Sequence, residues 1–291
     1  MTKRPRQAHK KRSDAGFSRR GSKKTGPGES RREATRAPKR QTSGGPNPGE
    51  NLFLYGIHSV EAALGNPRRN LVRLLATENG LSRLERHDAD LSKVEIVLAE
   101  PGQLDRFVGR DAVHQGVVIE CKPLDAIDGS ELFLLAEHKL LLVLDQITDP
   151  HNVGAILRSA SAFGVGAILT THRNSAVESG VLAKAASGAL EHLPMIDVRN
   201  LSKAIGTLNE MGFVTIGLDS AGPDVLEATI AGSNGKPVAL VLGAEGKGLR
   251  EKTRESCLHL ARLDMPGAIK SLNVSNAAAL SLYIASRGHT A

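Results

Sequence analysis

The chain has 291 residues, with 38 Lys and Arg against 31 Asp and Glu, which gives a formal net charge of +7 at pH 7. No stretch approaches the ~18 consecutive apolar residues of a membrane span, which argues against an integral membrane protein. The N-terminus lacks the apolar core of a secretory signal, and the only two cysteines, Cys121 and Cys257, lie outside any metal-ligand spacing. We therefore expect a reduced, cytoplasmic protein without a metal site.

Most of the positive charge lies in residues 1–50, which hold 15 Lys and Arg but only 4 Asp and Glu. With seven Gly, five Pro and only two large apolar residues, this segment cannot bury enough surface to offset the entropy of ordering. We predict a disordered basic arm. It could bind nucleic-acid phosphates, act as a solubilising tail or serve as a mitochondrial transit peptide, and its composition favours the first function.

The next segment, 51–122, has the pattern of a small α/β domain. Order is expected to begin near 51–55. Short helices are predicted at 56–64, 81–87 and 101–108, and strands at 71–76, 94–98 and 117–121. Charged and turn residues then predict a linker over 123–138, with one short apolar break at 132–135.

From residue 139 to 291, apolar runs alternate with helical patterns. The runs at 140–144, 167–170, 213–218, 238–242 and 258–263 are typical of strands buried on both faces. Helices are predicted at 153–163, 176–189, 200–211, 249–256 and 274–287. This alternation predicts an α/β fold with a mostly parallel sheet and helices on both faces.

Three polar loops follow strands of this sheet, at 145–152, 243–248 and 264–273. Ligands of such sheets bind outside the carboxyl ends of the strands, so these loops are the candidate site. Each also has a purely structural explanation. Asn152 or Ser275 could cap a helix, Arg158 could form an ion pair instead of a phosphate contact, and the glycines of 243–248 could form an ordinary turn.

Taken together, the three loops resemble the motifs of the SpoU-type branch of the SPOUT methyltransferases, which methylate RNA ribose 2′-hydroxyls. The first motif matches Asp149–Ala160, the second Leu242–Leu249 and the third Ser271–Ser275, in the same order and spacing. The small domain adds Tyr55–Leu64 and His114–Val117, which look like the ends of the family's ribosomal-protein-like RNA-binding domain.

The resemblance implies a C-terminal trefoil knot, a homodimer and a pocket for S-adenosylmethionine. The residues that it implies for cofactor binding are Gly243, Leu263, Met265, Gly267 and Leu272. The segment Leu263–Gly267 departs from the Ile-Pro-Met of many relatives, because Asp264 replaces the proline.

For the chemistry, the resemblance assigns catalytic roles to Arg158, Asn152, Glu245, Ser271 and Asn273. A guanidinium is normally protonated, so Arg158 could hold the RNA phosphate and the hydroxyl instead of acting as the base. The two-domain form favours a guanosine ribose of 23S ribosomal RNA as the substrate. A transfer RNA ribose, or a non-catalytic role in RNA binding or ribosome assembly, are the alternatives.

Overall fold

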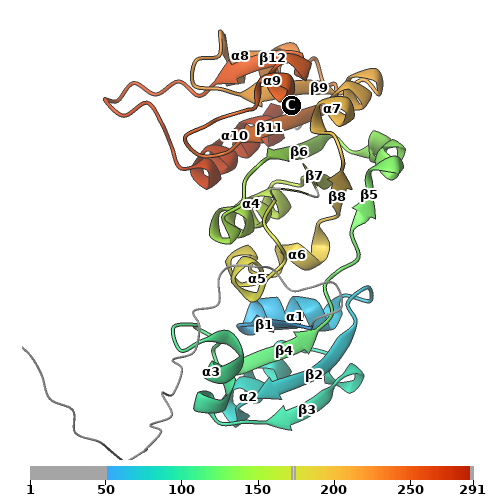
Figure 1. Cartoon of the computed structure of the whole chain (residues 1–291), viewed down its shortest axis with the longest axis vertical. Coiled ribbons are helices and arrows are strands. Elements are labelled where there is room, and N and C mark those ends of the chain that lie inside the picture. Colours follow the sequence, from blue (N-terminus) through green and yellow to red (C-terminus); the bar gives the residue numbers. More distant parts are fainter. Residues whose placement is uncertain (1–50, 172, 174, 289–291) are drawn as a thin grey trace, which may run out of the picture. The chain divides into compact units, whose positions relative to one another are not determined.

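The computed structural model describes residues 51–171, 173 and 175–288, all of which belong to one compact unit, Ser43–Ala291. The predicted basic arm lies outside the described residues. Two sheets organise the described chain, one of four strands and one of eight (Figure 1). None of the helices in this part of the chain combines the length and apolar character that a membrane span requires.

The four-stranded sheet has the order β1-β4-β2-β3, with β4 antiparallel to both neighbours and β2 parallel to β3. The predicted elements of 51–122 are all present, and a short 3-10 helix, η1, is added. Their bounds are β1 Leu52–Tyr55, α1 Ile57–Gly65, β2 Leu71–Ala76, α2 Glu78–Arg86, η1 Leu91–Lys93, β3 Glu95–Leu98, α3 Pro101–Val108 and β4 Val117–Cys121.

The eight-stranded sheet has the order β10-β12-β9-β11-β6-β7-β8-β5, and every neighbouring pair is parallel. This confirms the predicted parallel α/β fold. Its strands are β5 Ile127–Asp128, β6 Leu140–Asp145, β7 Ala167–Thr171, β8 Met195–Val198, β9 Val214–Leu218, β10 Asp224–Val225, β11 Val238–Gly243 and β12 His259–Arg262.

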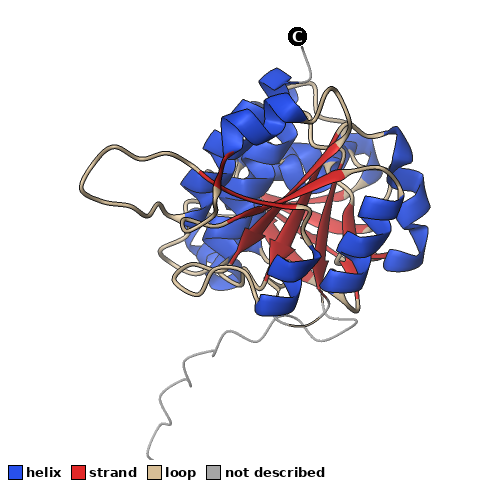
Figure 2. Cartoon of the chain, turned by 90° about the horizontal axis from the view of Figure 1, so that it is seen from above, coloured by secondary structure: helices blue, strands red, loops and turns tan. Residues whose placement is uncertain are grey.

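Helices lie on both sides of this sheet (Figure 2). They are η2 Gly129–Glu137, a 3-10 helix, and α4 Pro150–Ala162, α5 Gly180–Ala186, α6 Ala189–His192, α7 Leu201–Glu210, α8 Leu226–Gly232, α9 Glu251–Ser256 and α10 Val274–Gly288. Strand β6 shows why an unbroken apolar run fits here. Leu140, Leu142 and Leu144 belong to one buried cluster, whereas Leu141 and Val143 belong to another. Successive side chains of a strand point to opposite faces, so both faces are buried.

Two expectations need correction. The helix predicted at 176–189 is two helices, because Ser187 (φ 51°) and Gly188 (φ 94°) adopt left-handed backbone conformations that end α5 before α6 begins. The predicted linker contains β5, which pairs with β8, and η2, whose Leu132 and Leu135 pack into a core cluster. This segment therefore contributes a strand to the eight-stranded sheet and a 3-10 helix that packs on it.

Candidate active site

Side chains from all three polar loops meet beside the carboxyl ends of the central strands. The amide nitrogen Nδ2 of Asn273 donates to Oδ1 of Asn152 at 3.0 Å and to Oε2 of Glu245 at 3.4 Å. Asn152 lies in the first turn of α4, Glu245 follows β11, and Asn273 immediately precedes α10. The fold thus brings three of the five predicted catalytic residues into one hydrogen-bonded group.

Asn273 also caps α10. Its Oδ1 accepts from the backbone N–H of Ser275 at 2.9 Å and from the Ser275 hydroxyl at 2.6 Å. The carboxamide oxygen therefore faces the helix, and the amide NH₂ must face Asn152 and Glu245. Because Ser275 fixes the carboxamide oxygen of Asn273, the cap of α10 also orients the amide toward Asn152 and Glu245.

Asn152 is not a helix cap. Helix α4 begins at Pro150, and the side chain of the preceding Asp149 accepts from the backbone N–H of His151 at 3.0 Å. Proline suits the first helical position because its missing N–H would have no partner there. Since Asp149 caps the helix, the carboxamide of Asn152 is available for Asn273.

Arg158 is exposed on α4, and within the described residues it has no hydrogen-bond or ion-pair partner. A structural ion pair, one of its two alternatives from sequence, is therefore not found. Its guanidinium, with five N–H donors, is open to an anionic ligand such as phosphate. Arg158 does not join the Asn273 group through any hydrogen bond.

A pocket of about 390 Å³ opens next to Glu245, within the size range of small-molecule sites. Of the five residues predicted to bind a cofactor, four line it, namely Gly243, Leu263, Met265 and Leu272. Two predicted catalytic residues, Glu245 and Ser271, also line it. Gly267 lies on the exposed loop after β12 and is not among the lining residues.

The glycine loop after β11 is a tight turn and not a simple strand-to-helix connection. The backbone N–H of Gly248 donates to the carbonyl of Ala244 at 2.8 Å, so the loop folds back on itself. A Cβ atom at Gly243 would lie only 2.1 Å from the carbonyl carbon of Gly248. Gly246 and Gly248 have φ values of 77° and 67°, which glycine adopts without strain. This part of the pocket wall is therefore backbone whose close packing at Gly243 and left-handed conformation at Gly246 and Gly248 favour glycine.

Two family models match the chain. The SpoU rRNA Methylase family matches residues 139–283, and the RNA 2′-O ribose methyltransferase substrate-binding family matches residues 53–126. Curated relatives match over most of the chain. Proteins from Vibrio parahaemolyticus and Pseudomonas syringae are each 38% identical to it over 245 residues. The match covers 81% of this chain and 97% of the Vibrio protein, and 82% and 96% for the Pseudomonas protein. Both are named 23S rRNA (guanosine-2′-O-)-methyltransferase RlmB.

The chain belongs to the SpoU methylase family. Solved structures agree on the SpoU fold. The methyltransferase AviRb from Streptomyces viridochromogenes, in complex with AdoMet, matches with a TM-score of 0.68 at 22% identity, covering 82% of this chain and 91% of that one. An AdoMet-bound rRNA methyltransferase from Sinorhizobium meliloti matches with a TM-score of 0.67 at 21% identity, covering 82% and 87%.

Sequence reasoning missed one residue pair at this site, Asp145 and Arg250. Asp145, at the end of β6, is fully buried. Its carboxylate accepts from the backbone N–H of Arg250 at 3.0 Å and from Arg250 Nε at 2.7 Å. Arg250 follows Gly248 and Leu249, which line the pocket. Asp145 therefore anchors the far end of the glycine loop. The position of Asp145 at the end of the apolar run 140–144 could have marked it as a site residue. Nothing in the sequence identified Arg250, 105 residues away, as its partner.

Sequence reasoning also missed a buried charge cluster, which links the part of the chain around the four-stranded sheet (51–122) to α6. The buried guanidinium of Arg69 pairs with Glu178 and Glu191, each at 2.5 Å, and Asn66 Nδ2 donates to Glu191 at 2.7 Å. Burial raises the pKa of the Glu178 carboxyl above its ordinary value, although the Arg69 charge acts in the opposite direction. A buried, hydrogen-bonded ion pair fixes geometry, so this cluster holds the two family-matched segments together.

Proposed function

We propose that this chain transfers a methyl group from S-adenosylmethionine to a ribose 2′-hydroxyl of structured RNA, with a guanosine of 23S rRNA as the substrate. The observation that carries the proposal is the hydrogen-bonded group of Asn152, Glu245 and Asn273 next to a pocket. These side chains come from the three motifs of a methyltransferase family. The substrate follows from the relatives' printed name.

The pocket residues suit the chemistry of S-adenosylmethionine. Leu242, Leu263 and Leu272 offer apolar contacts suited to an adenine ring, and the glycine loop lets a ligand approach the backbone closely. Gly243, Met265 and Leu272 would hold the cofactor, which supplies an already activated methyl group. Gly267 does not line the pocket, and its role in cofactor binding stays a prediction.

The protein then has to orient the ribose and remove one proton. We assign Arg158 to hold the RNA phosphate and the attacking hydroxyl, because its guanidinium is exposed and without a partner among the described residues. Asn152 and Glu245, held by Asn273, orient the ribose, and Ser271 contacts it from the edge of the pocket. Holding two reactants in line supplies much of the acceleration in such a displacement.

We further propose the finer features that the family resemblance implies. The connection after β12 leads to α10, which packs against α4, the helix that follows β6. Strands β9 and β11 lie between β12 and β6 in the sheet, so the chain crosses back over them. This supports a trefoil knot. Leu280 and Tyr283 of α10 are about half exposed, at 48% and 50%, which supports a homodimer interface. We keep the division into a basic arm (1–50), an RNA-binding domain (51–122) and a methyltransferase domain (139–291), and the connecting segment (123–138) adds β5 and η2 to the large sheet. We propose that the protein acts in the cytoplasm with the rRNA and that no metal takes part in the reaction.

Methyl transfer from labelled S-adenosylmethionine to separated 23S rRNA and tRNA tests the proposal. The RNA should come from a strain that lacks this protein, so that the target is unmodified. Label in 23S rRNA that disappears with Arg158→Ala supports it. Label in tRNA would overturn the substrate but keep the reaction. Absence of S-adenosylmethionine binding, together with no transfer to RNA or to immature ribosomal particles, would contradict the enzyme and favour the non-catalytic role.

A further inference from the structure

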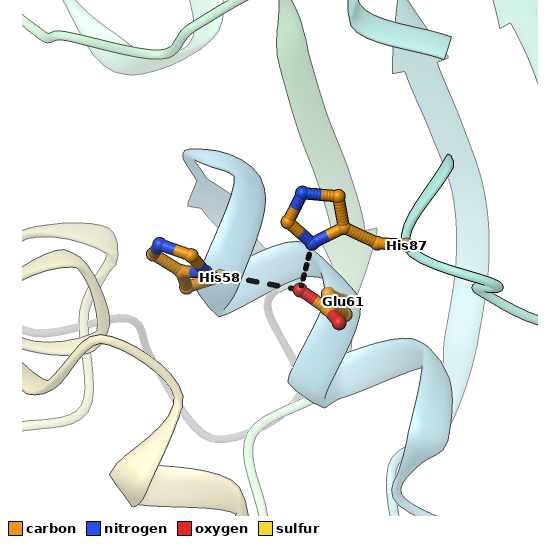
Figure 3. Close-up of side chains that lie close together, drawn as sticks. All are labelled: His58, Glu61 and His87. Carbon is orange, nitrogen blue, oxygen red and sulfur yellow. Dashed lines mark hydrogen bonds and ion pairs between the residues drawn. The ribbon is translucent and has the colours of Figure 1, made fainter. Parts of the chain in front are cut away.

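Two histidines and a glutamate lie close together on the surface of segment 51–122, and none of them lines the pocket. His58 and Glu61 lie three residues apart on α1, and His87 directly follows α2. The Nδ1 atoms of both imidazoles face the same oxygen, Oε2 of Glu61, at 3.1 Å from His87 and 3.8 Å from His58 (Figure 3). The two rings are 6.1 Å apart between centroids.

The two histidines share one carboxylate. Within the described chain, no Lys or Arg forms an ion pair with Glu61, whose partners are the two histidines. Each imidazole meets Glu61 through Nδ1, which donates to the carboxylate when it carries a proton and offers a lone pair to a metal ion when it does not. Side-chain exposures of 64% for His58, 34% for Glu61 and 42% for His87 leave the group open to ions in solution.

The geometry suits a small divalent ion. One ligand atom from each of the three residues lies within 4.8 Å of the other two. In a tetrahedral zinc site, bonds of about 2.0–2.2 Å place ligand atoms about 3.3 Å apart. The His87 to Glu61 distance of 3.1 Å and the His58 to Glu61 distance of 3.8 Å already approach that value. Small side-chain rotations would close the remaining gap, and exposed side chains make them at little cost.

We propose that His58, Glu61 and His87 form a binding site for a divalent transition-metal ion of the zinc class, with water as the fourth ligand. Two imidazole nitrogens and one carboxylate favour such an ion over magnesium or calcium, which prefer all-oxygen ligands. The ion would tie α1 to the end of α2. This site is separate from the methyl-transfer pocket, and it revises the expectation of no metal, which rested on the lack of a Cys/His ligand spacing around Cys121 and Cys257.

Metal titration of the full, tag-free chain tests the proposal after treatment with a chelator. Cobalt(II) is the optical probe, because its visible absorption reports tetrahedral nitrogen and oxygen ligands, and zinc binding is measured by calorimetry. We expect one ion per chain. His87→Asn and Glu61→Gln should each weaken binding at least about tenfold, since each removes a direct ligand. All three positions are partly exposed, so the variants should keep the wild-type circular dichroism spectrum.

His259→Asn is the matched control. His259 pairs with a single carboxylate, that of Asp224, at 3.6 Å, and its exposed fraction of 45% is close to that of His87. The proposal predicts that this variant binds the ion as the wild type does. It also predicts that zinc raises the melting temperature of the wild type and of His259→Asn but not of His87→Asn. No binding by the wild type, binding unchanged in His87→Asn, or equal losses in all variants would each overturn it.

Discussion

Asp145→Asn tests how the glycine loop is held in place. The Asp145 carboxylate is fully buried and accepts two hydrogen bonds from Arg250, one from the backbone N–H and one from Nε. Asparagine has nearly the same shape, so no cavity forms. The substitution removes the negative charge and leaves one of the two Arg250 donors facing an NH₂ group.

The expected cost follows from those contacts. Hydrogen bonds to a charged group contribute about 1.5–3 kcal/mol each, and removing one partner of a buried pair costs about 3–5 kcal/mol. The Arg250 side chain is 46% exposed and can regain water, which lowers the cost. We expect the free energy of unfolding to fall by about 2 kcal/mol.

The cofactor should also bind more weakly. Gly248 and Leu249 line the pocket and precede Arg250, so a loosened Arg250 lets the pocket wall move. If ordering the loop costs about 1.4 kcal/mol on binding, the dissociation constant of S-adenosylmethionine rises about tenfold. Urea denaturation and calorimetry measure the two effects.

Asp90→Asn is the control for Asp145→Asn. Asp90 forms an exposed pair with Lys93 at 3.0 Å, and neither residue lines the pocket. Such pairs contribute at most about 1 kcal/mol, and asparagine keeps an acceptor for the backbone N–H of Ser92, so stability and cofactor affinity should hardly change. If Asp145→Asn were as mild as Asp90→Asn in both assays, the anchoring role of Asp145 would be refuted.

Four further outcomes are expected. Asn273→Asp keeps the acceptor for Ser275 but removes the donor to Asn152 and Glu245, so kcat/KM should fall about 10²-fold with little loss of helix stability; an active variant would contradict the role of the amide. Gly243→Ala places a Cβ atom 2.1 Å from Gly248, so calorimetry should show at least a tenfold loss of cofactor affinity (about 1.4 kcal/mol). Because burial raises the pKa of the Glu178 carboxyl, the stability that this group contributes is fully present below its ordinary pKa of 4.5 and is lost as pH rises through the raised pKa. Glu178→Gln should therefore gain stability relative to the wild type as pH rises between those two pKa values. Parallel stability-versus-pH curves for the two proteins would refute this. Deleting residues 1–50 should weaken RNA binding and flatten its salt dependence, and an unchanged slope would exclude the arm as a phosphate contact.

Local patterns predicted most of the fold. The long apolar runs of β6, β7, β9 and β11 were predicted to within a residue or two, since burial on both faces leaves an unbroken signal. Strand β8, Met195–Val198, was missed because it has four residues and includes Asp197. Strands β5 and β10 have two residues each, which is too short for any periodicity.

The site was only partly predictable for a related reason. The motifs identified Asn152, Glu245 and Asn273, but their hydrogen bonds depend on how three loops meet in space. Nothing in the local sequence distinguished Asn152 from a helix cap until Asp149 was seen to cap α4. Pairings such as Arg69 with Glu191, 122 residues apart, carry no local signal at all.

The central claim is that the three loops place a ribose 2′-hydroxyl for methyl transfer. Its most direct test is mass spectrometry of the nucleosides from 23S rRNA after reaction with the full chain and isotope-labelled S-adenosylmethionine. We predict labelled 2′-O-methylguanosine, and none when Arg158→Ala replaces the wild type. Label on a guanine base, or labelled ribose that persists with Arg158→Ala, would contradict the account.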